Sequence, residues 1–347
     1  MESINICSYF GEQAMSFNLS GYKNIAIINF HHIGDTVGDF SLFKYCRLQA
    51  PQAKITIFLG KENGVLAPYI DCCDEAIVLP VTSKKRRYLQ LTKAAFKYRG
   101  QFDLVICGLE PRKYIHIFMW LLGARTSIAY IENTWHSKLI NQGVVYNEPQ
   151  QRQWHNALHM LNVVADYREL PQALYPRINL TEEIKHLFLP QIMAKLGEKI
   201  VAPRLLVSVT NNRVQSTIDL VTYCDLFAEL KKQFDFSVIV SYLPKDKARA
   251  DELVRILPVA AIALVTPNFS EFLVLLDLID CCLLGDGGIT HLAAALNKPQ
   301  VVLFGGVSLI EWRPLSSNVR YLYHQEHVKY IDKKTIVLKL EEMLRNK

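Results

Sequence analysis

Seven consecutive residues near the carboxyl end of the chain, Gly285-Asp286-Gly287-Gly288-Ile289-Thr290-His291, are of the types that cradle an anion. An apolar run precedes them and the helix-forming run 292–296 follows, so they are predicted to form the turn between a buried strand and a helix. The start of a helix has unpaired N–H groups and a positive dipole end, and glycines let a phosphate approach that backbone closely. Asp286 is suited to accept hydrogen bonds from the turn or a sugar hydroxyl, and His291 to donate to a phosphate oxygen. The same residues also suit a structural turn, with Asp286 as the helix N-cap and His291 packed on the helix.

A second polar turn, residues 31–39, follows the first apolar run of the chain. Its Asp35 has the chemistry of a general base, because a carboxylate there can take the proton of an attacking hydroxyl. From the pattern alone, the N-cap of a helix that begins near Thr36 is the favoured alternative for Asp35. Asp39 is the competing carboxylate, and its position is typical of an acid in the first turn of a helix.

Histidine and basic residues supply further candidates for binding an anion. His31 and His32 can contact phosphate or sugar, although such histidines commonly pack or form structural hydrogen bonds. Arg213 follows the first strand of the second half and either pairs with a diphosphate or is a solvated loop charge. The basic segment 84–99 contains seven Lys and Arg with aromatic residues interleaved. Such segments are commonly solvated helix faces, and the functional alternative is binding to an anionic lipid head group or membrane surface.

The elements that must position these residues form two similar series. Short apolar runs alternate with helix-forming segments, as in βαβ domains, whose ligands bind at the carboxyl ends of the strands. In the first half, strands are predicted at 24–30, 54–59, 75–79 and 102–107, with helices at 40–48 and 88–98. In the second half, strands are predicted at 205–209, 236–240, 261–265 and 301–306 and within 275–284, with helices at 182–196, 218–233, 247–257, 271–276 (capped by Ser270) and 333–345. Between them lies the polar segment 133–182, with a helix predicted from Gln151 to about Ala165.

Composition restricts the class of protein. The chain has 347 residues, half of them hydrophobic, which is enough for two domains with separate cores. A formal charge of +6 and a pI near 8.8 suit anionic substrates or an anionic membrane face, and we expect no nucleic-acid partner. Eight cysteines without Cys-x-x-Cys spacing indicate a reducing compartment, and no residues have the spacing of a metal site. No signal peptide or membrane-spanning run is predicted, so we expect a cytoplasmic protein, at most peripheral at a membrane.

The two polar turns, taken together, resemble those of glycosyltransferase family 9, the ADP-heptose:lipopolysaccharide heptosyltransferase group. The segment IAIINFHHIGDTVGDFSLFKYCRLQAPQAKITIFLG resembles that family's first strand, Ile-Gly-Asp turn, helix and second strand. The segment LLGDGGITHLAAALNKPQVVLFGG resembles its Asp-Thr-Gly-x-x-His-Leu-Ala-Ala-Ala signature and the strand that follows. Between these segments the similarity is one of pattern and domain order.

This resemblance implies an α/β protein with the GT-B fold, in which two Rossmann-like, doubly wound domains face a central cleft. Residues 1–180 would bind the acceptor and residues 181–325 the nucleotide sugar, while residues 326–347 would form a helix that packs back on the first domain. The general base would be Asp35, with His32 and Gly34 beside the acceptor. The donor-binding residues would be Thr210, Asn211, Arg213, Asp286, Gly287, Gly288 and His291.

The implied reaction is the inverting transfer of heptose from ADP-heptose to the lipopolysaccharide or lipooligosaccharide core. It would need neither metal nor cofactor and would take place at the inner face of the inner membrane. Three departures from the family pattern keep the donor sugar open. Gly287 replaces a threonine, His31 and His32 replace small hydroxylated residues, and Arg213 stands in for a lysine. The alternatives are a family member that uses a hexose or N-acetylhexosamine donor, and a nucleotide-sugar-binding module without catalysis.

Overall fold

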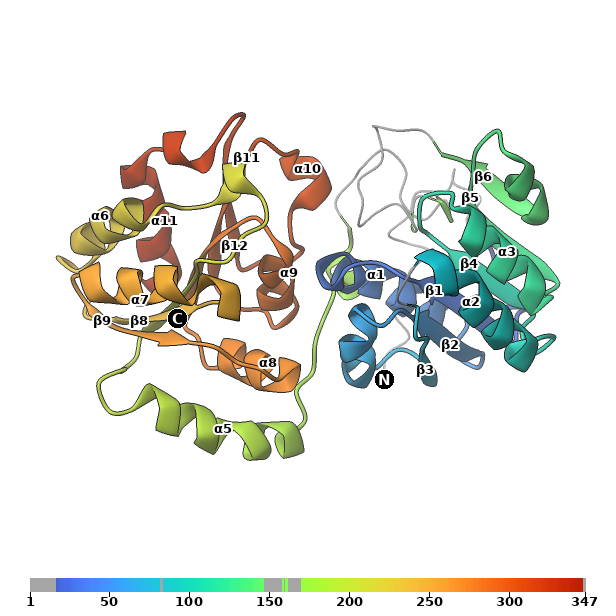
Figure 1. Cartoon of the computed structure of the whole chain (residues 1–347), viewed down its shortest axis with the longest axis horizontal. Coiled ribbons are helices and arrows are strands. Elements are labelled where there is room, and N and C mark those ends of the chain that lie inside the picture. Colours follow the sequence, from blue (N-terminus) through green and yellow to red (C-terminus); the bar gives the residue numbers. More distant parts are fainter. Residues whose placement is uncertain (1–16, 82–83, 147–157, 159, 162–169, 346–347) are drawn as a thin grey trace. The chain divides into compact units, whose positions relative to one another are not determined.

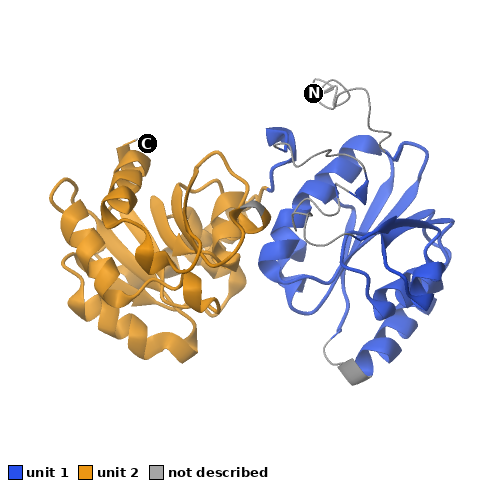
Figure 2. Cartoon of the chain, turned by 90° about the horizontal axis from the view of Figure 1, so that it is seen from above, with its two compact units in different colours: residues 1–176 blue, residues 177–347 orange. Residues whose placement is uncertain are grey.

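The chain folds into two compact units, residues 1–176 and 177–347 (Figures 1 and 2). This computed structural model describes residues 17–81, 84–146, 158, 160–161 and 170–345. The division falls four residues before the boundary expected at residue 180. The helix predicted from Gln151 to Ala165 falls largely outside the described residues.

The first unit is organised around a six-stranded parallel sheet of order β3-β2-β1-β4-β5-β6. Its strands are β1 (Asn24–Asn29), β2 (Lys54–Leu59), β3 (Glu75–Val78), β4 (Leu104–Cys107), β5 (Thr126–Ile131) and β6 (Gln142–Val145). Its helices are α1 (Ile33–Gln49), α2 (Lys84–Tyr98) and α3 (Lys113–Leu122), with 3₁₀ turns η2 (Asn63–Tyr69), η3 (Trp135–Leu139) and η5 (Gln172–Leu174).

The central strand β1 shows why the apolar runs become a parallel sheet. Ala26 and Ile28 pack on one face, in a core shared with α2 and α3, while Ile25 and Ile27 alternate with them toward the other face and are equally buried. A strand covered on both faces reads as a continuous apolar run, which is how β1, β2 and β4 were predicted.

The sequence prediction was wrong about where α1 begins. The helix was expected at 40–48 after a polar turn, but it starts at Ile33, so most of that turn is helical. Gly34 and Gly38 suggested a loop, yet both are buried within the helix. Strands β5 and β6 were not predicted at all.

The second unit repeats this architecture with a parallel sheet of order β12-β11-β10-β7-β8-β9. Its strands are β7 (Arg204–Ser208), β8 (Ser237–Ser241), β9 (Ala260–Leu264), β10 (Cys281–Gly285), β11 (Gln300–Gly305) and β12 (Val319–His324). Its helices are α5 (Glu182–Leu196), α6 (Leu220–Leu230), α7 (Lys247–Ile256), α8 (Phe269–Asp277), α9 (Gly288–Ala295), α10 (Leu309–Trp312) and α11 (Lys333–Arg345), with 3₁₀ turns η6 (Val214–Ser216), η7 (Pro244–Asp246) and η8 (Val328–Tyr330). The N-cap of α8 is Asn268, which accepts from the N–H groups of Ser270 and Glu271, so the predicted cap at Ser270 was wrong.

The carboxyl-terminal helix α11 belongs to the core of the second unit. Ile336, Val337 and Leu340 are buried in the cluster that also contains residues of β7, β8, β10 and α6. Within this unit, the apolar face of α11 is buried against the sheet and α6. The expected packing of residues 326–347 on the first domain stays a prediction.

Both units are therefore doubly wound α/β folds, as predicted. In each sheet the strand order reverses between the first and fourth strands of the unit, β1 and β4 in one and β7 and β10 in the other. At such a point the connections leave in opposite directions, and the carboxyl ends of the two strands are free to hold a ligand. Among the described residues, no helix is both long and apolar enough to cross a membrane.

Candidate active site

The predicted donor-binding residues lie at the carboxyl edge of the second sheet, where the strand order reverses. Strands β7 and β10 are neighbours there, with Val207 beside Leu283. After β7 the chain passes over the ends of β10 and β11. A Cβ on Gly285 would lie 1.9 Å from the carbonyl oxygen of Ser216, so only glycine allows this approach. The close approach places the loop after β7 directly on the Asp-Gly-Gly turn.

An ion pair joins the two predicted donor-binding segments. Nη1 of Arg213, in the loop after β7, lies 2.5 Å from Oδ2 of Asp286, which follows β10. The Asp286 side chain is 2% exposed and that of Arg213 is 32% exposed. One side of the guanidinium therefore binds a buried carboxylate, and the remaining exposed donors are suited to phosphate oxygens.

Two further contacts fix this pair in place. The guanidinium of Arg213 lies over the indole ring of Trp312, 4.4 Å from Cζ to the ring centroid. The side-chain amide of Asn211 donates to the carbonyl oxygens of Ser216 and Asp286, and its own oxygen accepts from the backbone N–H of Arg213. Asn211 therefore links the loop after β7 to the turn after β10 by hydrogen bonds. No sequence pattern indicated Trp312, which lies in the short helix α10, after the segment that resembles family 9.

Helix α9 begins directly after Asp286. Its N-cap is Gly287, without a side-chain capping bond, so the alternative in which Asp286 caps the helix was wrong. Gly288 is the first helical residue, and its N–H lies in the positive end of the helix dipole. Gly287 is fully extended, with φ 169° and ψ 176°, and a Cβ there would meet only the carbonyl oxygen of Gly285, at 4.0 Å. A threonine would fit at this position.

His291 lies on the first turn of α9 and is buried. Burial lowers its pKa from 6.5 to about 4, and the charge of Arg213 lowers it further in the same direction. The imidazole is therefore neutral at pH 7 and can act only as a neutral hydrogen-bonding group. It cannot supply a positive charge to a diphosphate at that pH.

The hydroxyl of Thr210 is engaged within the protein. It donates to Oδ2 of Asp246 at 2.6 Å and accepts from the N–H of Leu243 at 2.9 Å. Thr210 therefore ties the loop after β7 to the segment after β8. The structure brings Asn211, Arg213 and the Asp286 turn together, and it gives Thr210 a positioning contact.

Asp35 lies at the carboxyl edge of the first sheet, in the first turn of α1. The N-cap of α1 is His32, so the alternative in which Asp35 is the N-cap was wrong. The Asp35 side chain is half-buried and lies at the positive end of the helix dipole, a position that suits an acidic side chain. These features suit a carboxylate that must stay charged and reachable.

The predicted acceptor-binding residues flank Asp35. Gly34 is buried in the first turn of α1. His32 is exposed, and its Nδ1 lies 2.6 Å from Oε1 of Glu62. The hydrogen bond to Glu62 raises the pKa of His32, and the nearby charge of Asp35 raises it as well. The raised pKa extends the imidazolium form of His32 to higher pH than that of a free histidine.

A buried polar network supports this turn from below. The side-chain oxygen of Asn29 accepts from Thr36 and Asn63, and its amide donates to Oδ2 of Asp39 at 2.7 Å. Nε2 of His31 lies 3.4 Å from the same Asp39 oxygen. Burial raises the pKa of Asp39 well above its usual value, and Asp35 contributes in the same direction. Asp39 is thus a buried acid in the second turn of α1, contrary to the first-turn position predicted for it.

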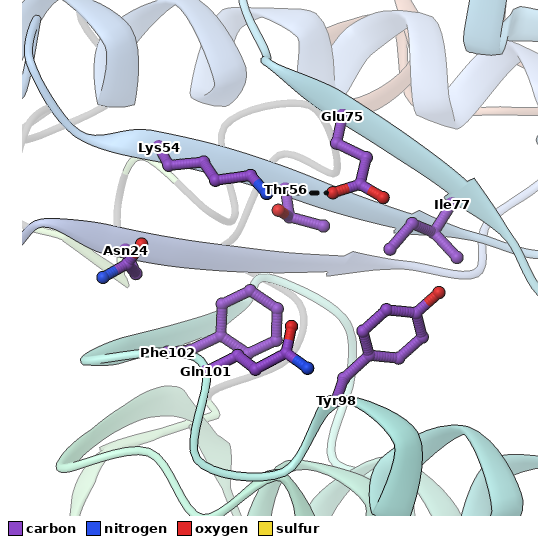
Figure 3. Close-up of a pocket in the computed structure, with 8 residues that line it drawn as sticks. All are labelled: Asn24, Lys54, Thr56, Glu75, Ile77, Tyr98, Gln101 and Phe102. Atoms are coloured by element: carbon purple, nitrogen blue, oxygen red, sulfur yellow. Dashed lines mark ion pairs between the residues drawn. The ribbon is translucent and has the colours of Figure 1, made fainter.

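The pocket drawn in Figure 3 lies at the opposite edge of the first sheet. It has a volume of about 230 Å³ and is lined by residues at the starts of β1, β2 and β3 and around the end of α2. Lys54 and Glu75, 3.3 Å apart, form an ion pair across its rim. Because ligands of doubly wound domains bind at the carboxyl ends of the strands, this pocket is distinct from the candidate site. In the described ranges, no group of three or more His, Cys, Asp and Glu residues is arranged to hold a metal.

Solved structures of known proteins have a similar architecture. A glycosyl transferase of family 9 from Veillonella parvula DSM 2008 is 14% identical and superposes with a TM-score of 0.81 over 96% of this chain and 99% of that one. E. coli ADP-heptose lps heptosyltransferase II is 19% identical, with a TM-score of 0.73 over 93% and 99% of the two chains. E. coli heptosyltransferase WaaC with ADP is 13% identical, with a TM-score of 0.67 over 92% and 99%. No curated protein has a matching sequence.

Two doubly wound units with this likeness define an α/β protein of the GT-B type, and the chain is a glycosyltransferase. Residues 219–340 match the model of Glycosyltransferase family 9 (heptosyltransferase). The matched range contains the whole Asp-Gly-Gly turn and Trp312, but it begins after Arg213.

Proposed function

We propose that this protein transfers heptose from ADP-heptose to a hydroxyl of the lipopolysaccharide or lipooligosaccharide core, with inversion at the anomeric carbon and without a metal. The match of residues 219–340 to the family 9 model supports this proposal, as do two similar structures, those of an ADP-heptose lps heptosyltransferase and of a heptosyltransferase with ADP. The observation that carries it is the Arg213 guanidinium held by Asp286 and Trp312 at the carboxyl edge of the second sheet.

The proposed reaction assigns a step to each group. Asp35 takes the proton of the acceptor hydroxyl, whose oxygen forms a bond to the anomeric carbon as the bond from that carbon to the ADP oxygen breaks. The electron pair leaves with ADP, so negative charge develops on its terminal phosphate. Arg213 and the N-terminal N–H groups of α9 are suited to stabilise that charge. His32 and Gly34 would border the acceptor.

A second donor class is favoured by one observation. Gly287 leaves open space where the family pattern has a threonine, so the site lacks one hydroxyl and gains room. A donor with a different sugar, such as a hexose or an N-acetylhexosamine, is the alternative that this change supports. A panel of ADP- and UDP-linked sugars, each tested with one purified core acceptor, separates the two. Turnover with a UDP-hexose and none with ADP-heptose would reject our proposal.

The catalytic assignment is tested by a matched pair of isosteric variants. Asp35→Asn removes the proposed base, and we expect transfer to fall at least a hundredfold while ADP affinity in calorimetry stays within about twofold. Asp39→Asn replaces a buried acid whose pKa is raised well above its usual value by burial and which has no proposed part in proton transfer, so its transfer rate should remain near that of the wild type. Near-normal turnover in Asp35→Asn would remove Asp35 as the base. ADP binding without donor consumption by the wild type would instead indicate a binding module without catalysis.

A further inference from the structure

Helix α2 exposes apolar side chains on the side that faces away from its sheet. Leu91 and Ala95 are buried in the core shared with β1, β4 and α3. Leu89 and Phe96 are 59% and 65% exposed. They are seven residues apart, which is close to two helical turns, so both lie on the same outer side of α2. Large apolar side chains are rarely left this exposed in line on a helix that already has a buried face.

Basic residues alternate with these apolar ones. Arg86, Lys93 and Lys97 are exposed. Arg86 and Lys93 lie three or four residues from Leu89 or Phe96, and Lys97 lies four residues from Lys93, so the three cations share this side of the helix. We call Arg86, Leu89, Lys93, Phe96 and Lys97 the α2 stripe. Segment 84–99 contains seven Lys and Arg and no Asp or Glu, so no acid within it offsets this charge.

Two other cations of the segment contact helix α3. The guanidinium of Arg87 lies over the ring of Tyr114, 4.3 Å from Cζ to the centroid, and Arg99 donates to the carbonyl oxygen of Leu121 at 2.8 Å. Both bonds join α2 to α3, and Figure 1 shows the two helices side by side. Trp120, 55% exposed on α3, adds an aromatic side chain near the carboxyl ends of this helix pair. The α2 stripe is therefore presented by a helix that is fixed in place.

We propose that the α2 stripe docks this protein on an anionic lipid bilayer. A bilayer surface can accept both kinds of side chain at once: Leu89 and Phe96 enter the boundary between head groups and acyl chains, while the cations meet the lipid phosphates. Nucleic acid would use the charges but offers little to an aliphatic side chain such as Leu89. This inference deepens the proposed function, because it brings the enzyme to the surface where a lipid-anchored acceptor lies.

Vesicle binding tests the α2 stripe in the absence of donor and acceptor. A protein that does not bind vesicles would therefore not contradict the proposed transfer reaction. We would measure co-sedimentation of the full chain with phosphatidylcholine vesicles with and without phosphatidylglycerol. The wild type should bind the anionic vesicles, bind neutral ones much more weakly, and lose binding as salt screens the charges. Each charge removed should weaken binding by about fivefold.

Two variants divide the stripe into its components. Leu89→Ser/Phe96→Ser removes the apolar part, and Lys93→Glu/Lys97→Glu reverses two charges. Both should lose at least tenfold in affinity for anionic vesicles. The matched control is Lys334→Glu/Leu338→Ser on α11, where a lysine and a leucine are also exposed on one side of a helix. Its binding should equal that of the wild type.

Three outcomes would overturn the proposal. Unchanged vesicle binding in both stripe variants would show that the stripe makes no contact with the bilayer. Competition by duplex DNA, with affinity unaffected by Leu89→Ser/Phe96→Ser, would indicate a nucleic-acid surface. A change of oligomeric state in light scattering would indicate that the stripe joins two copies of the chain. ADP binding and circular dichroism confirm that each variant is folded, and transfer to a short soluble acceptor should stay at the wild-type rate.

Discussion

At the scale of single residues, the partner of Asp286 is Arg213 rather than a ligand. A buried carboxylate is costly unless it is paired, and the 2.5 Å contact to Arg213 supplies that pairing. The pair in turn fixes the direction of the guanidinium, whose exposed remainder faces the carboxyl edge of the sheet. This gives a reason for an aspartate in an anion-binding turn, where a negative charge would otherwise repel the ligand.

The role of the Arg213–Asp286 pair can be tested by measuring the stability and the ADP affinity of a single and a double variant. Arg213→Ala leaves Asp286 buried without its partner, and we expect a loss of about 1–3 kcal/mol in the free energy of unfolding. Arg213→Ala/Asp286→Asn should regain most of that stability, because the unpaired charge is gone. It should not regain ADP affinity, because the cation is still absent. Urea unfolding and calorimetry measure the two quantities, and equal recovery of both would contradict a role for Arg213 in binding the diphosphate.

Gly287 provides a prediction about donor choice. Its backbone is extended and a Cβ there has free space, so Gly287→Thr should fold with stability within about 0.5 kcal/mol of the wild type. The added hydroxyl restores a donor or acceptor beside α9, so the preference among nucleotide sugars should shift toward ADP-heptose. Relative kcat/KM values for two donors measure this, with Gly287→Ala as the control that adds volume without a hydroxyl. If the alanine variant shifts the preference equally, volume rather than hydrogen bonding is responsible.

The sequence indicated the types of site residues better than their contacts. Asp286 and Arg213 were each singled out, but nothing in the chain order indicated that they bind one another, because 73 residues separate them. Asn29 carried a detectable signal, since it is a polar residue within an otherwise apolar strand, and it is the centre of the network under α1. Trp312 carried no such signal, because its contact with Arg213 depends on where α10 lies relative to the loop after β7.

At the scale of elements, the strands with the longest apolar runs were predictable, and so were the edge strands β3 and β9, whereas the inner strand β5 and the edge strands β6 and β12 were missed. Strands β1, β2, β7, β8 and β11 are nearly continuous apolar runs because both faces are covered. The strands β6 and β12 lie at the edges of their sheets and are mostly exposed or half-buried, so their sequences resemble loops. The early start of α1 was missed because glycine is a poor helix former in isolation, and only packing shows why Gly34 and Gly38 are tolerated.

Helix α11 offers a test of its place in the second unit. Leu340 is fully buried in the core of that unit, whereas Leu338, two residues away, is 57% exposed. Leu340→Ala should therefore cost about 2–5 kcal/mol in the free energy of unfolding and lower ADP binding as the second unit loosens. Leu338→Ala, the matched control, should change stability by less than about 0.5 kcal/mol. Equal effects of the two substitutions would show that α11 does not bury Leu340 in solution.

At the scale of the whole molecule, the two units use one topology for two kinds of chemistry. In each unit, the candidate site lies after the central strands, where the strand order reverses. In each unit, the first turn of a helix carries candidate site residues at that place. In the first unit that turn holds the carboxylate of Asp35, and in the second it begins with glycines beside a buried ion pair. The sheet order is the same, so the difference in proposed role comes from a few residues at the strand ends.

Each unit also holds a histidine with a lowered pKa beside its site, His291 buried and His31 half-buried, which makes the protein sensitive to acid. The pKa of His291 is lowered to about 4 and that of His31 to about 3, chiefly by burial. In the unfolded chain both imidazoles take up protons near pH 6.5, so between that pH and the lower folded pKa the unfolded state binds more protons. Stability is therefore complete above pH 6.5 and is lost as pH falls, by on the order of 3 kcal/mol for His291 by pH 4. Urea unfolding across this range should show a weaker pH dependence for His291→Gln than for the wild type, while the exposed His186→Gln should follow the wild type. Parallel curves for all three proteins would mean that His291 takes up its proton without opening the second unit.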